Sequence, residues 1–235
     1  MKANIVNIKD INSDDIANML NKKSFVMAIP TDTVYALCCN ANDEDAVANI
    51  YNLKNREKDK PISLFIKSLD ELDKYVMGGA INTVGAVSDN LYNNTVGAFI
   101  ECPYTEKKNC TGEYLQNPTI EMLNKYWPGA LTVIFKKKKN IYDYLTSGKD
   151  TIGIRIPDDK LLLDILAKVD FPLAQTSCNM SHEKELKNAK EIYDKFGDKV
   201  DLIIQTNADV VGKASTIISV ENRDIKVLRQ GDIKL

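Results

Sequence analysis

The sequence PTDTVY at residues 30–35 separates two short apolar segments, residues 25–29 and 34–39, and each of these is predicted to form a strand. Proline cannot donate a hydrogen bond to a neighbouring strand, so Pro30 marks the break between them. The hydroxyl groups of Thr31 and Thr33 are therefore expected in a loop at strand ends, where ligands usually bind.

A cationic loop follows, with the sequence KNREKDKP at residues 54–61. Apolar residues recur at helical spacing over residues 43–55, and residues 62–66 form a continuous apolar run, so the loop is predicted to join a helix to a buried strand. Hydroxyl groups and clustered cations beside short strands suit a small polar substrate and a polyphosphate. Both loops are therefore predicted to belong to one site.

The rest of the chain alternates strand and helix patterns, which is typical of a layered α/β domain. We expect one domain over residues 1–235, with an insertion at about 78–118 that is either a lid near the site or a peripheral excursion. Ser13 is predicted to cap a first helix. Further helices are expected at 118–126, 159–169 and 189–196, and further strands at 131–135, 152–156, 173–176, 200–205, 215–220 and 225–229.

The charge balance excludes a general attraction to polyanions. The chain carries 31 Lys and Arg residues against 33 Asp and Glu residues, a net charge of −2, so any nucleotide site must be local. No apolar run approaches the roughly 18 residues that span a bilayer, and residues 1–10 lack the features of a secretory signal. We expect a cytoplasmic protein without membrane contact, whose five cysteines are reduced and mostly structural.

Polar residues interrupt several predicted strands. In residues 152–156 (IGIRI), three isoleucines share one face at a period of two, which places Gly153 and Arg155 on the other face. A buried guanidinium needs an anionic partner, which is either an internal carboxylate or a carboxylate or phosphate of a ligand.

The ends of three other strands raise a similar choice. Arg229 is either a site residue or a surface arginine, and the hydroxyls at Ser215 and Thr216 are either ligand contacts or ordinary strand residues. Ser177 and Asn179 belong either to the site or to a turn or helix cap.

Familiar nucleotide and metal motifs are absent from the sequence. Residues 212–215 (GKAS) resemble the end of a P-loop, but Asn207 and Ala214 occupy the positions that require Gly and Ser or Thr. The single histidine, His182, lies in a polar stretch and is predicted to face solvent. One histidine cannot supply a His-rich zinc site, so no metal site built by the protein is predicted.

Seven segments, in order and at similar spacing, resemble the signature segments of the YrdC-type threonylcarbamoyl-AMP synthase family. They are P-T-D-T-V-Y-A-L, K-x-R-x-x-x-K-P, W-P-G-A-L-T, T-I-G-I-R-I-P, T-S-C-N, A-S-T-I-I and V-L-R-Q-G, which extend from Pro30 to Gly231. The resemblance therefore covers nearly the whole chain.

This resemblance implies an open, twisted mixed α/β sheet with flanking helices around a deep cationic cleft. It also implies a nucleotidyltransferase that condenses L-threonine, bicarbonate and ATP into threonylcarbamoyl-AMP and pyrophosphate, for the modification of adenosine 37 in tRNA. By motif position, the implied catalytic residues are Lys54 and Arg56, the threonine-binding residues are Thr33, Arg155, Ser177 and Ser215, and the ATP-binding residues are Arg56, Lys60, Thr151, Asn179 and Arg229.

The family also implies Mg²⁺ held mainly by the ATP phosphates, and a downstream tRNA threonylcarbamoyl transferase complex as partner. Contact with tRNA or double-stranded RNA is a further expectation. The chain departs from the family pattern at Glu57, where proline is usual, and at Phe65, where many members have a histidine. An RNA-binding module, a carbamoyl-phosphate-using transfer module or a non-catalytic scaffold of the same fold remain as alternatives.

Overall fold

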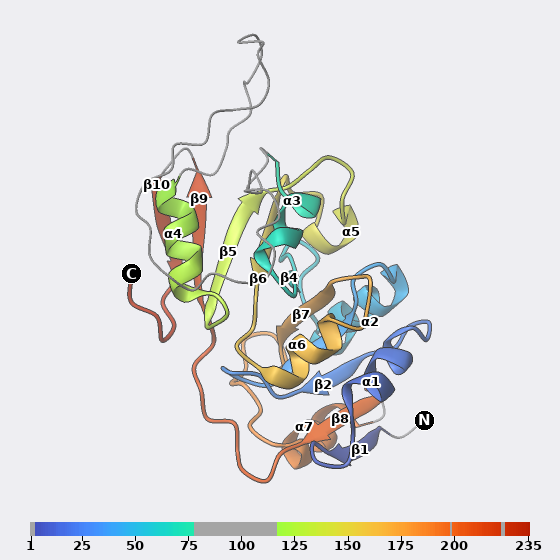
Figure 1. Ribbon diagram of the computed structural model, residues 1–235. Coiled ribbons are helices and arrows are strands. Elements are labelled where there is room, and N and C mark those ends of the chain that lie inside the picture. The colour runs from blue at the N-terminus through green and yellow to red at the C-terminus, as the bar shows by residue number, and fades with distance from the viewer. Residues whose placement is uncertain (1–2, 78–116, 198, 222–223) are drawn as a thin grey trace, which may run out of the picture.

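The computed structural model describes residues 3–77, 117–197, 199–221 and 224–235, so the predicted insertion at 78–118 lies almost entirely outside the described residues (Figure 1). The described strands are β1 (Asn4–Asn7), β2 (Met27–Ile29), β3 (Ala36–Asn40), β4 (Ser63–Phe65), β5 (Leu131–Lys136), β6 (Thr151–Arg155), β7 (Leu173–Ser177), β8 (Leu202–Gln205), β9 (Thr216–Glu221) and β10 (Asp224–Arg229). The described helices are α1 (Ser13–Leu20), α2 (Glu44–Lys54), η1 (Leu69–Glu71), α3 (Leu72–Tyr75), α4 (Asn117–Tyr126), α5 (Asp143–Thr146), α6 (Lys160–Leu166) and α7 (Ala189–Phe196).

These strands form one continuous sheet in the order β1-β8-β2-β3-β7-β4-β6-β5-β9-β10. The sheet contains parallel pairs, such as β4 with β6 and β5 with β9, and antiparallel pairs, such as β3 with β7 and β5 with β6. The predicted mixed α/β sheet with flanking helices is therefore confirmed.

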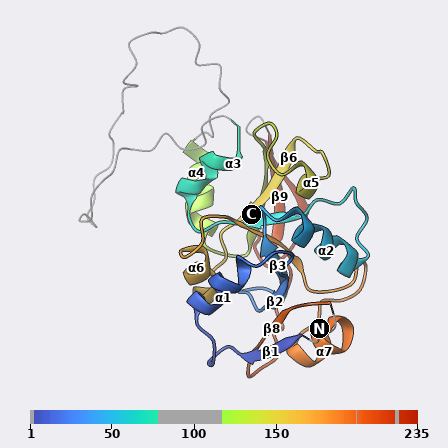
Figure 2. The same ribbon diagram turned by 90° about the vertical axis from the view of Figure 1, so that its right-hand side faces the viewer.

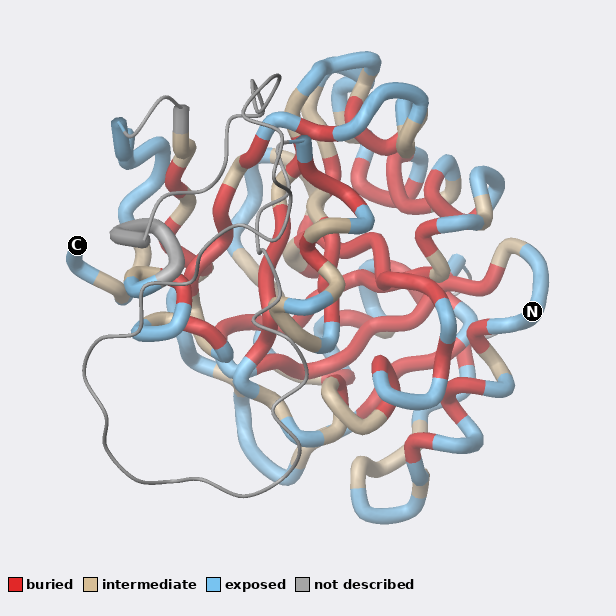
Figure 3. The backbone as a smooth tube through the Cα atoms, turned by 45° about the horizontal axis from the view of Figure 1, so that its top comes forward, coloured by how far each residue is buried: buried red, intermediate tan, exposed pale blue. Residues whose placement is uncertain are grey.

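Helices cover both faces of the sheet (Figure 2). On one face, α1 and α6 pack their apolar residues against alternate residues of β2, β3 and β7, among them Met27, Cys38 and Leu173. On the other face, α2 and α7 cover a larger cluster that includes Leu37, Leu64 and Ile154. Buried residues follow the central strands, whereas β10, at one edge of the sheet, is exposed throughout (Figure 3).

Local structure corrects several sequence expectations. The first helix is capped by Asn12 rather than Ser13, because the Asn12 side chain accepts a hydrogen bond from the backbone N–H of Asp15 and leaves Ser13 inside the helix. The helix predicted at 159–169 is shorter, since Asp159 is its N-cap and Ala167 already ends it. Strand β1 and helix α5 were not predicted.

Two other findings concern the described residues as a group. Cys38, Cys39 and Cys178 are free and buried, in agreement with the structural role expected for the cysteines. No helix in the part of the chain that the structure describes is both long and apolar enough to cross a bilayer.

Candidate functional site

A pocket of about 220 Å³ opens on the sheet face that α1 and α6 cover only in part. Its floor comes from alternate residues of neighbouring strands, because side chains at a period of two point to the same face. Gln175 of β7 and Ser63 of β4 are paired across the sheet, and Gly153 of β6 lies beside them. The adjacent row contains Phe65, Arg155 and Thr132.

The pocket brings together six of the residues that were predicted to belong to the site. They are Thr33, Arg56, Arg155, Ser177, Ser215 and Arg229. Their individual roles stay predictions. Arg56, Arg155 and Arg229, which are distant in sequence, all line this one pocket.

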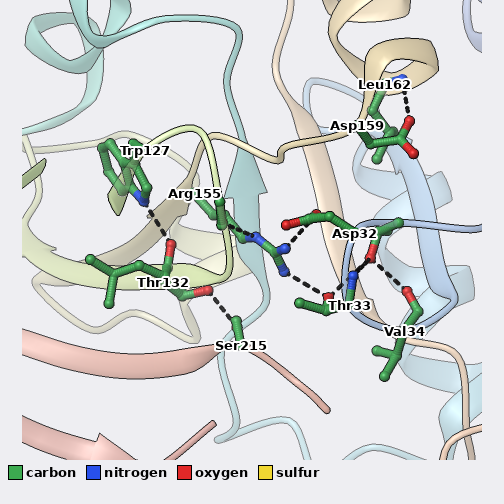
Figure 4. Close-up of polar contacts among 12 residues, drawn as sticks. Asp32, Thr33, Val34, Trp127, Thr132, Arg155, Asp159, Leu162 and Ser215 are labelled. Atoms are coloured by element: carbon green, nitrogen blue, oxygen red, sulfur yellow. Dashed lines mark hydrogen bonds and ion pairs between the residues drawn. The ribbon is translucent and has the colours of Figure 1, made fainter. Parts of the chain in front are cut away.

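Arg155 is the most deeply buried cation of this pocket, with a side chain 4% exposed. Its Nη2 lies 2.5 Å from a carboxylate oxygen of Asp32, its Nη1 donates to the Thr33 hydroxyl at 3.0 Å, and its Nε donates to the carbonyl of Gly129 at 2.9 Å (Figure 4). The guanidinium also lies 5.6 Å from the ring centre of Phe65. Burial lowers the pKa of Arg155, and the Asp32 charge opposes that shift.

The first of the two sequence alternatives for Arg155 is therefore confirmed, since an internal carboxylate pairs with it. The side chain also lines the pocket. A guanidinium has five N–H groups, and three of the N–H groups of Arg155 have partners within the described part of the protein.

Arg56 is held by its own loop. Asn55 ends α2 in a left-handed conformation and turns the chain away from the helix axis. The Arg56 side chain then donates to the carbonyls of Lys60 and Pro61, at 3.0 and 2.8 Å. The Tyr51 hydroxyl, 3.1 Å from the same Lys60 carbonyl, ties this loop to the segment before β6.

Arg229 and Ser215 meet on the opposite side of the pocket. The Arg229 guanidinium donates to the carbonyl of Ser215 at 2.8 Å and to its hydroxyl at 3.2 Å. The Ser215 hydroxyl also pairs with that of Thr132 at 2.8 Å (Figure 4). Burial lowers the pKa of Arg229, and the charges of Arg155 and Arg56 add to this lowering.

Lys54, which was predicted to be catalytic, does not line the pocket. It is 1% exposed, and its ammonium donates to the carbonyls of Ser177 and Asn179 and to the Asn179 side chain, at 2.5, 2.6 and 2.7 Å. These three bonds use all of its N–H groups. Asn179, predicted to bind ATP, likewise bonds inside the protein.

Two further predicted ATP-binding residues lie outside the pocket lining. The Lys60 ammonium is 2.7 Å from Glu57 and 3.3 Å from the ring of His182, which is exposed as predicted. Thr151 begins β6, on the same face as Arg155 but four residues away. At about 3.3 Å per residue this separation is roughly 13 Å.

Sequence reasoning missed part of the lining. Ser63 and Gln175 are joined side chain to side chain at 2.6 Å on the pocket floor, and Thr132 is buried beside Ser215. Ser63 and Thr132 alternate with buried apolar residues, the same signal that identified Arg155, so that pattern applied to every strand would have found these two. Gln175 is followed by the polar Thr176 and carries no such signal.

The described residues contain no group of three His, Cys, Asp or Glu side chains that could hold a metal ion. A mixed α/β sheet with guanidinium and hydroxyl groups around one pocket is an arrangement suited to anionic ligands. The family model described as telomere recombination, and named for Sua5, YciO and YrdC, matches residues 19–105 and 99–231. The chain therefore belongs to the Sua5/YciO/YrdC family.

Individual relatives agree with this assignment. A Methanocaldococcus jannaschii protein, provisionally named a threonylcarbamoyl-AMP synthase, is 29% identical over 241 residues, which cover 100% of this chain and 96% of the relative. The threonylcarbamoyl-AMP synthase of Schizosaccharomyces pombe is 26% identical over 226 residues, 94% of this chain but 51% of the relative. The chain thus spans about half the length of some relatives and nearly all of others.

Solved structures show the same fold. Pyrococcus abyssi Sua5, in a crystal structure with L-threonine, superposes with a TM-score of 0.74 at 24% sequence identity. That superposition covers 97% of this chain and 58% of the Sua5 chain.

Proposed function

We propose that this protein is an L-threonylcarbamoyladenylate synthase, a nucleotidyltransferase that joins L-threonine, bicarbonate and ATP and releases pyrophosphate. The observation that carries the proposal is the convergence of Arg56, Arg155 and Arg229 on one pocket with hydroxyl groups between them. The names of the relatives support the same reaction.

The two substrates are proposed to share the pocket and the surface beside it. The volume of about 220 Å³ is below the roughly 300–1,000 Å³ of most small-molecule sites, so it suits an amino acid better than a whole nucleotide. L-threonine is placed near Thr33, Arg155, Ser177 and Ser215. ATP extends past Arg56 and Arg229 toward Lys60 and Thr151, over a floor that Gly153 leaves open.

The proposed chemistry needs positioning and charge neutralisation rather than a titrating base in the pocket. The threonine amine forms a C–N bond with carbon dioxide from bicarbonate and releases a proton to solvent, which gives a carbamate. A carbamate oxygen then attacks the α-phosphorus of ATP, and the bond to pyrophosphate breaks. Guanidinium groups stabilise the negative charge on the phosphates during this displacement.

Lys54 and Asn179 are proposed to act indirectly, by holding the loop that carries Ser177. Mg²⁺ is proposed to enter with ATP, since the ion commonly keeps water ligands and binds through substrate phosphates. Transfer of the product to adenosine 37 of tRNA would then need a separate transferase complex. Direct contact of this chain with tRNA is a further expectation of the same proposal.

The reaction is tested by pyrophosphate release with all three substrates, with each one omitted, and with serine in place of threonine. Arg56→Ala and Arg155→Ala should each reduce the rate by about 100-fold or more, because removing one preorganised donor costs that much in comparable sites. Lys160→Ala is the control, because the Lys160 side chain is 88% exposed and pairs with Asp164 on the surface.

Near-normal rates in both arginine variants would contradict the proposed site. Pyrophosphate release that does not depend on threonine would contradict the proposed reaction. RNA binding without turnover, steeply weakened by salt, would instead favour the binding-module alternative.

A further inference from the structure

We propose that Glu57 competes with the nucleotide inside the protein: its carboxylate holds the Lys60 ammonium at the rim of the pocket, and a phosphate group must displace it. His182 supports this arrangement from the neighbouring loop. The proposal rests on the proposed function and deepens it, because it names residues that set the affinity for the phosphate end of ATP. Glu57 is a position where the chain departs from the family pattern, and His182 lies outside the seven family segments.

Two loops meet at this rim of the pocket. The first follows α2 and contributes Arg56 to the lining, and the Arg56 side chain donates to the carbonyl of Lys60 at 3.0 Å. Lys60 therefore lies beside the lining. The second loop follows β7, whose last residue, Ser177, also lines the pocket. The N–H of Ser181 donates to the carbonyl of Lys54 at 3.0 Å and ties the two loops together.

The first loop folds back on itself so that Glu57 faces Lys60. The N–H of Lys60 donates to the carbonyl of Glu57 at 3.1 Å and closes a turn. Across this turn, the Lys60 ammonium lies 2.7 Å from a carboxylate oxygen of Glu57. The hydrogen bond with Lys60 lowers the pKa of Glu57, so the carboxylate is ionised at neutral pH. Lys60 is thus paired with an anion before a ligand arrives.

His182 reaches the same pair from the second loop. Its Nε2 lies 3.3 Å from the Lys60 ammonium and 3.5 Å from the Glu57 carboxylate. This nitrogen accepts from Lys60 in one tautomer and donates to Glu57 in the other. The imidazole therefore contacts the ion pair in either state.

The backbone of His182 is strained at the point where this contact is made. The N–H of Glu183 donates to the carbonyl of Met180 at 3.1 Å, and within this turn His182 has a φ of +69°, a region that favours glycine. Strained conformations of this kind persist where surrounding contacts fix them, and they are concentrated at functional sites. The contacts of the imidazole with Glu57 and Lys60 are contacts of that kind.

The cluster remains open to a ligand. The side chains of Lys60, Glu57 and His182 are 39%, 56% and 71% exposed. Phosphate and carboxylate oxygens are both anionic acceptors, so they compete for the same ammonium. Exposed ion pairs are weak, so a polyphosphate with several charges can replace the carboxylate. The displaced carboxylate then repels the phosphates, which further lowers the affinity for ATP.

The test compares ATP with a ligand that carries no phosphate. ATP and L-threonine are titrated by calorimetry, at low salt, against the wild type and Glu57→Gln. Glu57→Gln should bind ATP about two- to fivefold more tightly, the range expected for an exposed ion pair, and the gain should shrink at high salt. The affinity for L-threonine should stay the same. Unchanged or weaker ATP binding by Glu57→Gln, or an equal gain for both ligands, would overturn the proposal.

Asp59→Asn is the matched control. It removes an equal charge from an exposed position of the same loop, whereas the Lys60 ammonium lies against Glu57. It should change the affinity for ATP less than Glu57→Gln does, and an equal gain would reduce the effect to net charge and overturn the proposal. In a Lys60→Met background, the gain from Glu57→Gln should fall to that of Asp59→Asn. A gain of undiminished size there would contradict competition for Lys60.

His182→Gly removes the imidazole and supplies the residue that the backbone conformation favours. It should also strengthen ATP binding, by less than Glu57→Gln, because the ion pair loses its contact with the second loop. Unchanged or weaker binding would overturn the part given to His182. A wild-type protein that binds neither ATP nor L-threonine would contradict the proposed function itself, which is a different outcome from ATP binding that no variant alters.

Discussion

Arg155 is both paired within the protein and part of the pocket lining. Its ion pair with Asp32 compensates the burial of the guanidinium, which would otherwise be costly. Thr33 and Gly129 then fix the direction of the group, so that the two remaining N–H groups keep a constant orientation. A site of this kind needs little rearrangement when an anion binds.

The buried charge of Lys54 is stabilised differently from that of Arg155. Its ammonium is surrounded by oxygen acceptors and, among the residues that the structure describes, has no carboxylate partner within hydrogen-bond distance. Burial, and to a smaller extent the nearby charge of Arg56, lower its pKa to about 8. The folded protein therefore releases this proton more readily than the unfolded chain does.

The pH dependence of stability should report this shift. Between the folded pKa of about 8 and the ordinary value of 10.5, the unfolded state binds more protons, so the free energy of unfolding rises with pH. Its difference between the wild type and Lys54→Met should increase by roughly 1 to 2 kcal/mol from about pH 8 to pH 9.5, at about 1.4 kcal/mol per unit. Urea unfolding at several pH values measures it.

The comparison with Lys54→Met removes contributions from other titrating groups, including the buried tyrosines. A difference that stays constant over this pH range would show that Lys54 keeps an ordinary pKa in the folded protein. The variant should also be less stable at every pH, because it leaves buried carbonyls without a donor.

At the scale of elements, the segment that joins β8 to β9 is the least expected part of the site. The two strands lie near opposite ends of the sheet, so this segment must cross its width. On the way it contributes Ala214 and Ser215 to the pocket. Gly212 passes so close to the Thr33 loop that an added Cβ would lie 1.8 Å from the Thr33 carbonyl oxygen.

Gly212→Ala should therefore push this segment away from Thr33. We expect a loss of about 1 to 3 kcal/mol in unfolding free energy, typical of overpacking, together with at least about tenfold weaker threonine binding. Calorimetry and ligand titration measure the two effects.

Gly148→Ala is the matched control. Gly148 has a φ of +69° and no neighbour within 4 Å of an added Cβ, so its replacement costs roughly 1 kcal/mol of strain without touching the pocket. Unchanged threonine affinity in Gly212→Ala would contradict the role given to the segment.

Elements with strong periodicity could be predicted from the sequence, and those defined by distant partners could not. The alternation in residues 152–156 predicted both β6 and the direction of Arg155. Strand β1 is only four residues long and largely exposed, and it is a strand because β8 pairs with it. Helix α5 is a single turn with a left-handed residue on either side. No apolar periodicity in the sequence predicts so short a helix.

The site residues were likewise predictable where a local pattern or motif marked them, and not where a distant partner decides their role. The residue types around the pocket followed from strand patterns and family motifs. The use of Lys54 and Asn179 inside the protein depends on a contact between α2 and the loop after β7, 125 residues apart in sequence. Such a contact has no local signature.

For the molecule as a whole, the sheet should show a gradient of protection from solvent. Residues of β3, β7 and β4 are almost all buried, whereas the six residues of β10 are exposed. Amide hydrogens of the central strands should exchange only through large-scale unfolding, and those of β10 through local opening. Hydrogen exchange followed by mass spectrometry should resolve the two groups, and equal rates would contradict the assigned strand order.

Because β8 lies between β1 and β2, this part of the sheet can assemble only after β8 has been synthesised. The first two strands leave the ribosome early, but the strand that joins them is nearly 200 residues from β1. At translation rates of about 5–20 residues per second, the nascent chain waits roughly 10 to 40 s for it. During that interval, the facing edges of β1 and β2 are open to chaperones and to other nascent chains.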